Sequence, residues 1–275
     1  MQTRNIGFIG GGNMAASLLG GLISDGFDAS NIWVAEPDTG RREDLSARFG
    51  VHTGADNSEL VNAVDVLVLA VKPQLLHEVC HDISAAVQGN RPLVISVAAG
   101  IRAADIDRWL DGDNAIVRTM PNTPALVKSG ATALYANNRV DAGQRELAEA
   151  IMRAVGLTLW VEEEALMDAV TALSGSGPAY FFLLIEILQQ SGQRLGLPEK
   201  SAHLLALQTA FGAAKMALES QEDCAELRAR VTSPGGTTER AITLLEEGGI
   251  RELFDKALHG ARDRAAELAD QLGEE

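Results

Sequence analysis

The chain has few of the features that mark disulfide-rich, metal-binding or nucleic-acid-binding proteins. Its only cysteines are Cys80 and Cys224, with no C-x-x-C pair, so neither a disulfide framework nor a metal site is expected. Lys and Arg number 23 against 38 Asp and Glu, which gives a formal net charge of −15. Such a chain lacks a clustered basic surface to neutralise phosphates, so we expect no nucleic-acid partner.

Long apolar runs are also missing. Residues 204–218 are interrupted by Gln208 and Lys215, and we expect no segment to reach the length of a membrane span. The first strand begins too early to leave room for a secretory signal. With 46% hydrophobic and 22% charged residues over 275 positions, the composition is that of a soluble globular protein with one large or two moderate domains. We therefore expect a cytoplasmic protein that makes no membrane contact.

What the sequence does contain is a glycine turn near its start, in the segment NIGFIGGGNMAA of residues 5–16. An apolar run before Gly10 predicts a buried strand, and leucines at helical spacing after Ala15 predict a helix. The form G-x-G-x-x-A, at Gly10, Gly12 and Ala15, is typical of dinucleotide-binding folds. The first glycine makes the turn, and the second lets the backbone approach a pyrophosphate. The helix N-terminus then offers N–H groups and a partial positive charge.

Strand and helix patterns alternate up to residue 161. Strands are expected over residues 32–35, 66–71, 93–98, 131–135 and 157–161, with another beginning at residue 116. Continuous apolar runs such as 66–71 are typical of central parallel strands that are covered on both faces. Residues 1–161 are therefore predicted to form a doubly wound α/β domain of the Rossmann type.

After residue 162 the pattern becomes helical. Helices expected over residues 172–188 and 198–220 are apolar nearly all round, and such helices must be covered on every side. One small domain cannot easily cover two of them, so we predict that a partner subunit does. The last helix carries an ordinary apolar stripe from Phe254 to Leu268. Residues 162–275 are thus predicted to form an all-α dimerisation domain.

Charged residues beyond the second strand leave the coenzyme open. Glu36 lies about 20 residues past the glycine turn, where an acidic side chain hydrogen-bonds a ribose 2′-OH and favours NAD. Arg41 and Arg42 follow, and guanidinium groups there could hold the 2′-phosphate of NADP. The alternative is that all three are solvated surface. Similarly, Lys72 at a strand end either meets the coenzyme or marks the exit of the strand to solvent.

The segment VTSPGGTTERA, residues 231–241, predicts a turn followed by a helix that begins at Thr237 or Thr238. A capping box needs Glu or Gln three residues after the cap, and Arg240 and Ala241 stand there instead. The N–H groups of this helix start are therefore candidates to bind a small carboxylate. The alternative is a capped helix after a flexible loop. Residues 174–178, SGSGP, have two similar interpretations: a capped helix start, or a backbone wall beside a nicotinamide.

Six segments in order along residues 8–238 resemble the pyrroline-5-carboxylate reductase family: FIGGGNMA, AVKPQ, SVAAGI, RTMPNTPA, ALSGSGPAY and VTSPGGTT. The last of these is the most specific, whereas the glycine turn alone fits many families. The resemblance implies that a hydride from NADPH or NADH is added to the C=N carbon of 1-pyrroline-5-carboxylate, giving L-proline. It also implies a homodimer with interlocked helical domains, often assembled further into a ring of five dimers.

The resemblance also implies which residues form the site. The coenzyme would be held by Ile9, Gly10, Gly11, Gly12, Asn13, Met14, Ala35, Glu36, Pro37, Asn57, Ala70, Val71, Lys72, Pro73 and Ala98. The substrate would be held by Glu164, Ser233, Gly236, Thr237 and Thr238. Of these, Thr238 would be catalytic, with its hydroxyl on the ring nitrogen. Glu36 departs from the small or basic residue of many NADPH-preferring members, and Arg230 is a further candidate for the phosphate of the coenzyme.

Two other functions compete with this one. A β-hydroxyacid dehydrogenase joins the same coenzyme fold to a helical domain, but its G-x-G-x-x-x-K segment carries a catalytic lysine. Counted from Gly175 and Gly177, that position is Phe181 here. A nucleotide-sensing regulatory protein would bind the coenzyme without needing a substrate loop, and residues 231–241 argue against it.

Overall fold

The computed structural model describes residues 4–274, which form two compact units. One unit extends up to Ser176 and takes in the chain from Gly260 onward, and the other spans Gly177–His259. By their contacts, residues 162–176 therefore belong with the first unit rather than with the helical one. The predicted boundary at residue 161 separates a coenzyme-binding domain from a substrate-binding domain, and this assignment of binding roles stays a prediction.

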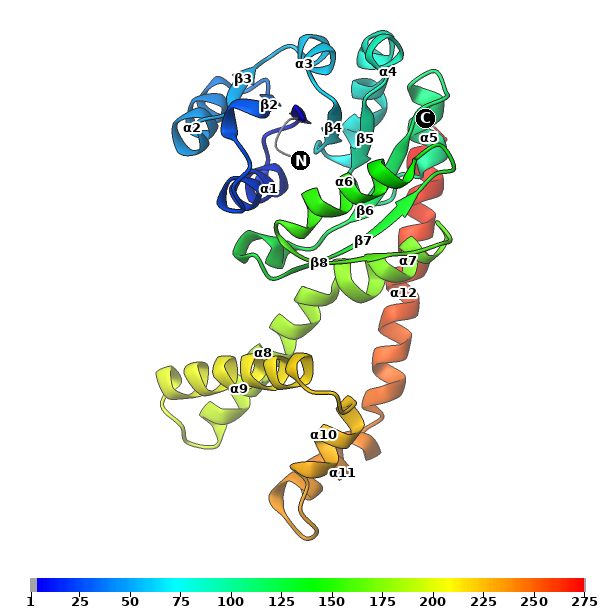
Figure 1. The fold of residues 1–275 in the computed structure, drawn as a ribbon. Coiled ribbons are helices and arrows are strands. Elements are labelled where there is room, and N and C mark those ends of the chain that lie inside the picture. Colours follow the sequence, from blue (N-terminus) through cyan, green and yellow to red (C-terminus); the bar gives the residue numbers. More distant parts are fainter. Residues whose placement is uncertain (1–3, 275) are drawn as a thin grey trace. The chain divides into compact units, whose positions relative to one another are not determined.

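The first unit is built on one eight-stranded sheet in the order β3-β2-β1-β4-β5-β6-β7-β8 (Figure 1). Neighbouring strands are parallel except for β6 and β7, which pair antiparallel. The strands are β1 (Ile6–Ile9), β2 (Ile32–Ala35), β3 (His52–Gly54), β4 (Val66–Leu69), β5 (Leu93–Ser96), β6 (Ile116–Met120), β7 (Gly130–Ala136) and β8 (Gly156–Trp160).

Helices cover both faces of this sheet. Successive residues of its central strands belong alternately to two buried clusters. Val66 and Val68 of β4 belong to one cluster, whereas Leu67 and Leu69 belong to the other. The first cluster includes residues of α1, α2 and α6, and the second includes residues of α3, α4 and α5. These helices are α1 (Asn13–Ser24), α2 (Thr39–Phe49), α3 (Asn57–Ala63), α4 (Pro73–Asn90), α5 (Ala103–Trp109) and α6 (Ala142–Arg153).

The predicted fold class is confirmed, and two details of the sheet were not foreseen. β3 is only three residues long and partly exposed, so it leaves no apolar run in the sequence. β7 runs antiparallel to β6 and parallel to β8, and an apolar pattern in the sequence does not give the direction of a strand. An apolar strand pattern predicts that the strand is buried, whereas the direction of the strand in the sheet depends on the connection that leads into it.

One helical stretch, Leu166–Arg194, connects the two units. It passes from α7 (Leu166–Val170) through a π-helical turn (Thr171–Gly175) into α8 (Gly177–Arg194). The side-chain amide of Asn122 donates to the Ser174 carbonyl oxygen at 3.2 Å. The π-helical turn is therefore fastened to the segment after β6. Of the two interpretations of residues 174–178, the capped helix start is wrong, because the π-helical turn continues directly into α8.

The second unit consists of helices: α8, α9 (Glu199–Glu219), α10 (Cys224–Arg230), α11 (Thr237–Glu247) and the first part of α12 (Ile250–Gly273). On α8 and α9 many large apolar side chains are exposed, among them Phe181, Phe182, Leu183, Ile187, Leu188, Leu204, Leu205, Phe211 and Met216. The stretch Leu166–Arg194 is long and apolar enough to cross a membrane, contrary to expectation. Core helices of soluble proteins reach the same length and apolar character.

Two helical glycines give opposite predictions for stability. A Cβ on Gly21 in α1 would lie 2.5 Å from the Ala154 carbonyl oxygen, whereas a Cβ on Gly89 in α4 meets nothing within 4 Å. Gly21→Ala should therefore cost about 1–3 kcal/mol through overpacking. Gly89→Ala should stabilise by roughly 0.5–1 kcal/mol, because alanine loses less backbone entropy in a helix. Thermal melts followed by circular dichroism check both signs. Equal melting temperatures for the two variants would contradict the packing of α1.

Candidate active site

The glycine turn joins the ends of three strands. The Gly10 N–H donates to the Ala35 carbonyl oxygen at 2.8 Å, and the Ala70 N–H donates to the Ile9 carbonyl oxygen at 2.8 Å. Gly10 has a φ of 96°, and a Cβ there would lie 2.7 Å from the Ala70 carbonyl oxygen. Only glycine fits this conformation and this close approach. The carboxyl ends of β1, β2 and β4 are therefore held together at one edge of the sheet.

The helix that follows presents its N-terminus without a side-chain cap. Gly12 is the N-cap of α1, no acidic residue lies in the first turn, and a Cβ on Gly12 would meet nothing within 4 Å. By contrast, Asp38 caps α2 and Asp56 caps α3 through side-chain hydrogen bonds. The first N–H groups of α1 thus have no side-chain cap from the N-cap residue, and donors of this kind at a helix N-terminus suit a pyrophosphate. The turn fits a dinucleotide.

The structure brings the predicted coenzyme residues to the same edge. They follow the carboxyl ends of β1, β2, β4 and β5 or, for Asn57, begin the helix after β3. The set is Ile9, Gly10, Gly11, Gly12, Asn13, Met14, Ala35, Glu36, Pro37, Asn57, Ala70, Val71, Lys72, Pro73 and Ala98. Ligands of open α/β sheets bind outside this edge. The binding roles of the individual residues stay predictions.

Glu36 has a partner that the sequence did not indicate. Its side chain is buried, and the Gly11 N–H donates to its Oε2 at 2.8 Å. The two residues are 25 positions apart, and no local pattern links them. Glu36 therefore supports the glycine turn from within, in addition to any contact that it makes with a ligand.

Glu164 is fixed by a buried arginine. The Arg118 guanidinium, 4% exposed, lies 3.1 Å from Glu164 Oε1 and 3.9 Å from Asp168 Oδ1. The Ala103 N–H donates to the same Glu164 Oε1 at 2.7 Å, which supplies a cap for α5. Sequence reasoning missed Arg118, although a cation within the apolar pattern of β6 is a signal that could have found it. A buried charge on a strand requires a partner of opposite sign.

The predicted substrate loop lies in the second unit. Gly235 has a φ of 72°, and Gly236 is the N-cap of α11 without a side-chain cap. The helix begins at Thr237, as predicted, and Thr238 lies in its first turn, partly buried. With Gly236 as the cap, the third helical residue is Glu239, so the expected lack of an acidic residue there is wrong. Its Oε2 accepts a hydrogen bond from the Gly235 N–H at 2.7 Å, and the Gly236 N–H donates to the Ser233 carbonyl oxygen at 3.0 Å. Both bonds hold the turn, and the N–H groups of Thr237 and Thr238 have no side-chain cap from the N-cap residue.

Arg230 precedes this loop and already has a partner. Its Nη1 donates to Glu222 Oε2 at 2.9 Å, and this hydrogen bond raises the pKa of the guanidinium. A role for Arg230 on a coenzyme phosphate would require that it exchange this carboxylate for the phosphate.

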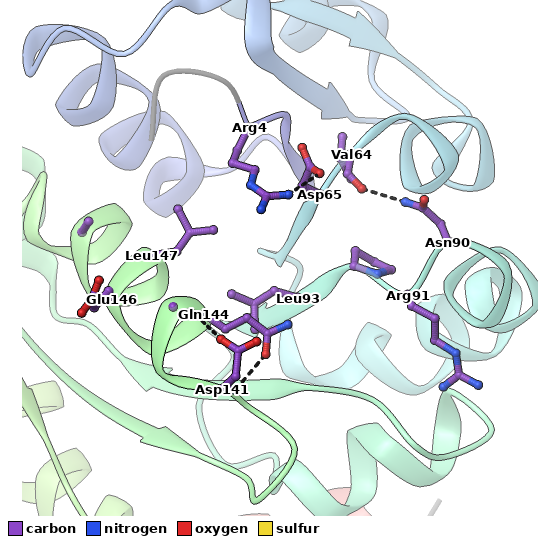
Figure 2. A pocket seen from close by; sticks show the side chains of 13 residues that line it. Arg4, Val64, Asp65, Asn90, Arg91, Leu93, Asp141, Gln144, Glu146 and Leu147 are labelled. Atoms are coloured by element: carbon purple, nitrogen blue, oxygen red, sulfur yellow. Dashed lines mark hydrogen bonds and ion pairs between the residues drawn. The ribbon is translucent and has the colours of Figure 1, made fainter.

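A hollow of about 810 Å³ opens at the opposite edge, beside the amino ends of β4 and β5 (Figure 2). Two of its polar side chains have partners within the chain: Arg4 lies 3.0 Å from Asp65, and the Asn90 amide donates to the backbone carbonyl oxygen of Val64 at 2.7 Å. The hollow is remote from the glycine turn, so we assign it no ligand. Within residues 4–274 no group of three or more side chains is arranged to hold a metal ion.

Comparisons with known proteins cover the whole chain. Residues 164–268 match a family described as pyrroline-5-carboxylate reductase dimerisation, and residues 5–100 match one described as NADP oxidoreductase coenzyme F420-dependent. The pyrroline-5-carboxylate reductase of Pseudomonas aeruginosa is 48% identical over 274 residues, covering 100% of both chains.

Two solved structures show the same likeness. That of a pyrroline-5-carboxylate reductase from Coxiella burnetii has a TM-score of 0.94 and 49% identity, and the match covers 97% of this chain and 99% of that one. The pyrroline carboxylate reductase of Plasmodium falciparum, solved with NADP bound, has a TM-score of 0.86 and 28% identity, covering 98% and 99%.

The open space at Gly12 gives a direct test of the glycine turn. Gly12→Val should fold like the parent, because an added Cβ meets no heavy atom within 4 Å and the φ of −72° suits residues other than glycine. It should nevertheless weaken the binding of NAD⁺ and NADP⁺ by at least about tenfold, since the valine fills the space that a phosphate needs. Calorimetric titration measures the binding, and a thermal melt controls for folding. Unchanged affinity for both dinucleotides would place the coenzyme elsewhere.

Proposed function

Because the chain belongs to the pyrroline-5-carboxylate reductase family, we propose that its first unit binds the coenzyme of that reaction and its second unit binds the substrate. The carboxyl edge of β1, β2, β4 and β5 holds the coenzyme, and the turn before α11 holds the substrate. The enzyme reduces 1-pyrroline-5-carboxylate to L-proline, with NADPH or NADH as the hydride donor. The observation that supports the division best is that α1 and α11, one in each unit, begin on glycines without a side-chain cap.

In this proposal the backbone of α11 binds the carboxylate of the substrate. Gly236 is the N-cap, and the N–H groups of Thr237 and Thr238 lie at the start of the helix, where its dipole favours an anion. Ser233 completes the loop, and its carbonyl oxygen accepts the Gly236 N–H at 3.0 Å. Glu239 holds the turn through the Gly235 N–H, so the loop has its shape before a substrate arrives.

Thr238 orients the reacting group. A cyclic imine accepts a hydride far more readily once its nitrogen is protonated, so the site must tolerate a positive charge. A neutral hydroxyl such as that of Thr238 can hydrogen-bond the nitrogen without repelling it. The nicotinamide, when bound, supplies the hydride to the imine carbon, and the chain supplies orientation and electrostatics. Glu164 lies close to the substrate in this proposal, with its carboxylate held in place by Arg118 and the Ala103 N–H.

The alternative of a β-hydroxyacid dehydrogenase lacks a group to act on an alcohol. Phe181 occupies the position of the lysine, and this residue is 63% exposed on α8 among other apolar side chains. In a homo-oligomer such a ring is a packing residue. Family membership and the substrate loop also leave no support for a regulatory protein without catalysis.

The chain forms a homo-oligomer, as the match to a dimerisation family over residues 164–268 indicates. We propose a dimer in which the exposed apolar faces of α8 and α9 are covered by the same helices of a second copy, and a ring of five such dimers. Apolar faces of this extent are rare on monomers and mark protein contacts. A cytoplasmic location is part of the same proposal.

Removing the Thr238 hydroxyl tests the assigned chemistry. Thr238→Ala should lower kcat/KM for 1-pyrroline-5-carboxylate by about 10²–10⁴-fold, the range of a positioned proton-transfer group. Thr238→Ser retains the hydroxyl and should keep most of the activity. Loss of nicotinamide absorbance measures the rate, with Thr243→Ala, also on α11, as the matched control. An alanine variant as fast as the parent would remove Thr238 from the mechanism.

A charge in the exposed apolar face tests the assembly. Phe182→Glu on α8 should separate the subunits, because an unpaired carboxylate cannot be buried in an apolar contact. Light scattering should then give the 29.1 kDa of one chain, whereas the parent gives two or ten times that mass. Leu126→Glu introduces the same charge at a leucine that is 59% exposed in the first unit, and should leave the mass unchanged. A monomeric parent would contradict the proposed dimer.

A further inference from the structure

The sequence left open whether Glu36 or the two arginines after it decide the choice of coenzyme, and the structure separates them. Glu36 is the first residue after β2, and its side chain is 7% exposed. The Gly11 N–H donates to its Oε2 at 2.8 Å, and the Asp38 N–H donates to its Oε1 at 3.2 Å. Two backbone donors from different segments therefore fix the carboxylate at the carboxyl end of β2.

The Arg42 guanidinium is hydrogen-bonded to acceptors of the chain itself. Its Nη1 donates to the carbonyl oxygens of Glu36 and Pro37 at 2.6 and 2.8 Å, and its Nη2 donates to the Thr39 hydroxyl at 2.8 Å. Three of the five N–H donors of the guanidinium are therefore in use. These bonds close the turn between β2 and α2 and restrict how far Arg42 can move toward a ligand.

Arg41 is the remaining cation, and it faces Glu36. Its Nη1 lies 3.6 Å from Glu36 Oε2, and its side chain is 53% exposed. If Arg41 turned outward to a phosphate, it would leave the buried carboxylate without its counter-charge. An uncompensated buried charge is costly, so the pair resists this exchange.

We propose that Glu36 is a specificity-determining residue that makes the enzyme prefer NADH over NADPH. This inference rests on the proposed function in one respect, the placement of the adenosine end of the coenzyme at the carboxyl end of β2. A carboxylate offers about four lone-pair sites, of which two are in use here, so it can still accept hydrogen bonds from a ribose diol. A 2′-phosphate has no proton to donate and brings like charge against a fixed carboxylate. Selectivity then comes from attraction to one coenzyme and repulsion of the other.

Calorimetric titration of the full-length protein with NAD⁺ and NADP⁺ tests the preference without relying on turnover. The parent should bind NAD⁺ at least about tenfold more tightly, a difference of about 1.4 kcal/mol. The same order should appear between AMP and adenosine 2′,5′-bisphosphate, which isolate the adenosine end. Glu36→Gln keeps an oxygen for the Gly11 N–H but removes the charge and releases Arg41. Its NADP⁺ affinity should rise and its NAD⁺ affinity should fall, so that the ratio of the two changes about tenfold and the coenzymes bind almost equally.

Glu43→Gln is the matched control, since Glu43 is exposed on α2 and the variant changes the net charge equally. It should leave both affinities as in the parent. A parent that binds NADP⁺ as tightly as NAD⁺, or a Glu36→Gln variant with an unchanged ratio, would overturn the inference. Gly12→Val separates this failure from failure of the proposed function. Loss of both coenzymes in Gly12→Val keeps the placement at the glycine turn, whereas retention of both would remove the placement itself.

Discussion

The close approach of Gly10 to the Ala70 carbonyl oxygen is the constraint on which the coenzyme edge depends. A side chain there would push β1 away from β4 and would break the hydrogen bond between the Ala70 N–H and the Ile9 carbonyl oxygen. β1 is also bonded to β2 through the Gly10 N–H. Because Gly10 lacks a Cβ, the carboxyl ends of β1, β2 and β4 can lie together. The start of α1, the carboxylate of Glu36 and the start of α4 all take their positions from that junction.

Sequence patterns predicted this part of the molecule well because burial dictates its composition. The expected strand at residues 32–35 has the same bounds as β2, and β4 and β5 lie within the apolar runs assigned to them. Strands covered on both faces cannot contain many polar residues, so they stand out. The short β3, the antiparallel direction of β7 and the π-helical turn at Thr171–Gly175 depend instead on pairing with distant segments, and a single sequence does not display such pairing.

In the candidate site, too, local features could be predicted from the sequence and contacts between distant segments could not. The glycines and threonines could be proposed as site residues from local motifs, because the role proposed for each uses its own backbone or hydroxyl. The partners of the charged residues could not, since Glu36 meets Gly11 and Glu164 meets Arg118 across 25 and 46 positions. The acidic residue after the cap of α11 was missed for a different reason. The cap was placed on a threonine, and moving it one residue back to Gly236 brings Glu239 into the capping position.

These charge pairs explain how a chain of net charge −15 can bind two anionic ligands. Arg118, Arg42 and Arg230 are each engaged with carboxylates or carbonyl oxygens of the chain itself. In the proposed site, the coenzyme pyrophosphate and the substrate carboxylate therefore fall to backbone N–H groups at the uncapped starts of α1 and α11. Backbone donors have fixed directions and need no counter-charge, so they can bind an anion while nearby carboxylates keep their own partners. An acidic residue such as Glu36 can then act on selectivity without abolishing anion binding, because the two tasks rest on different groups.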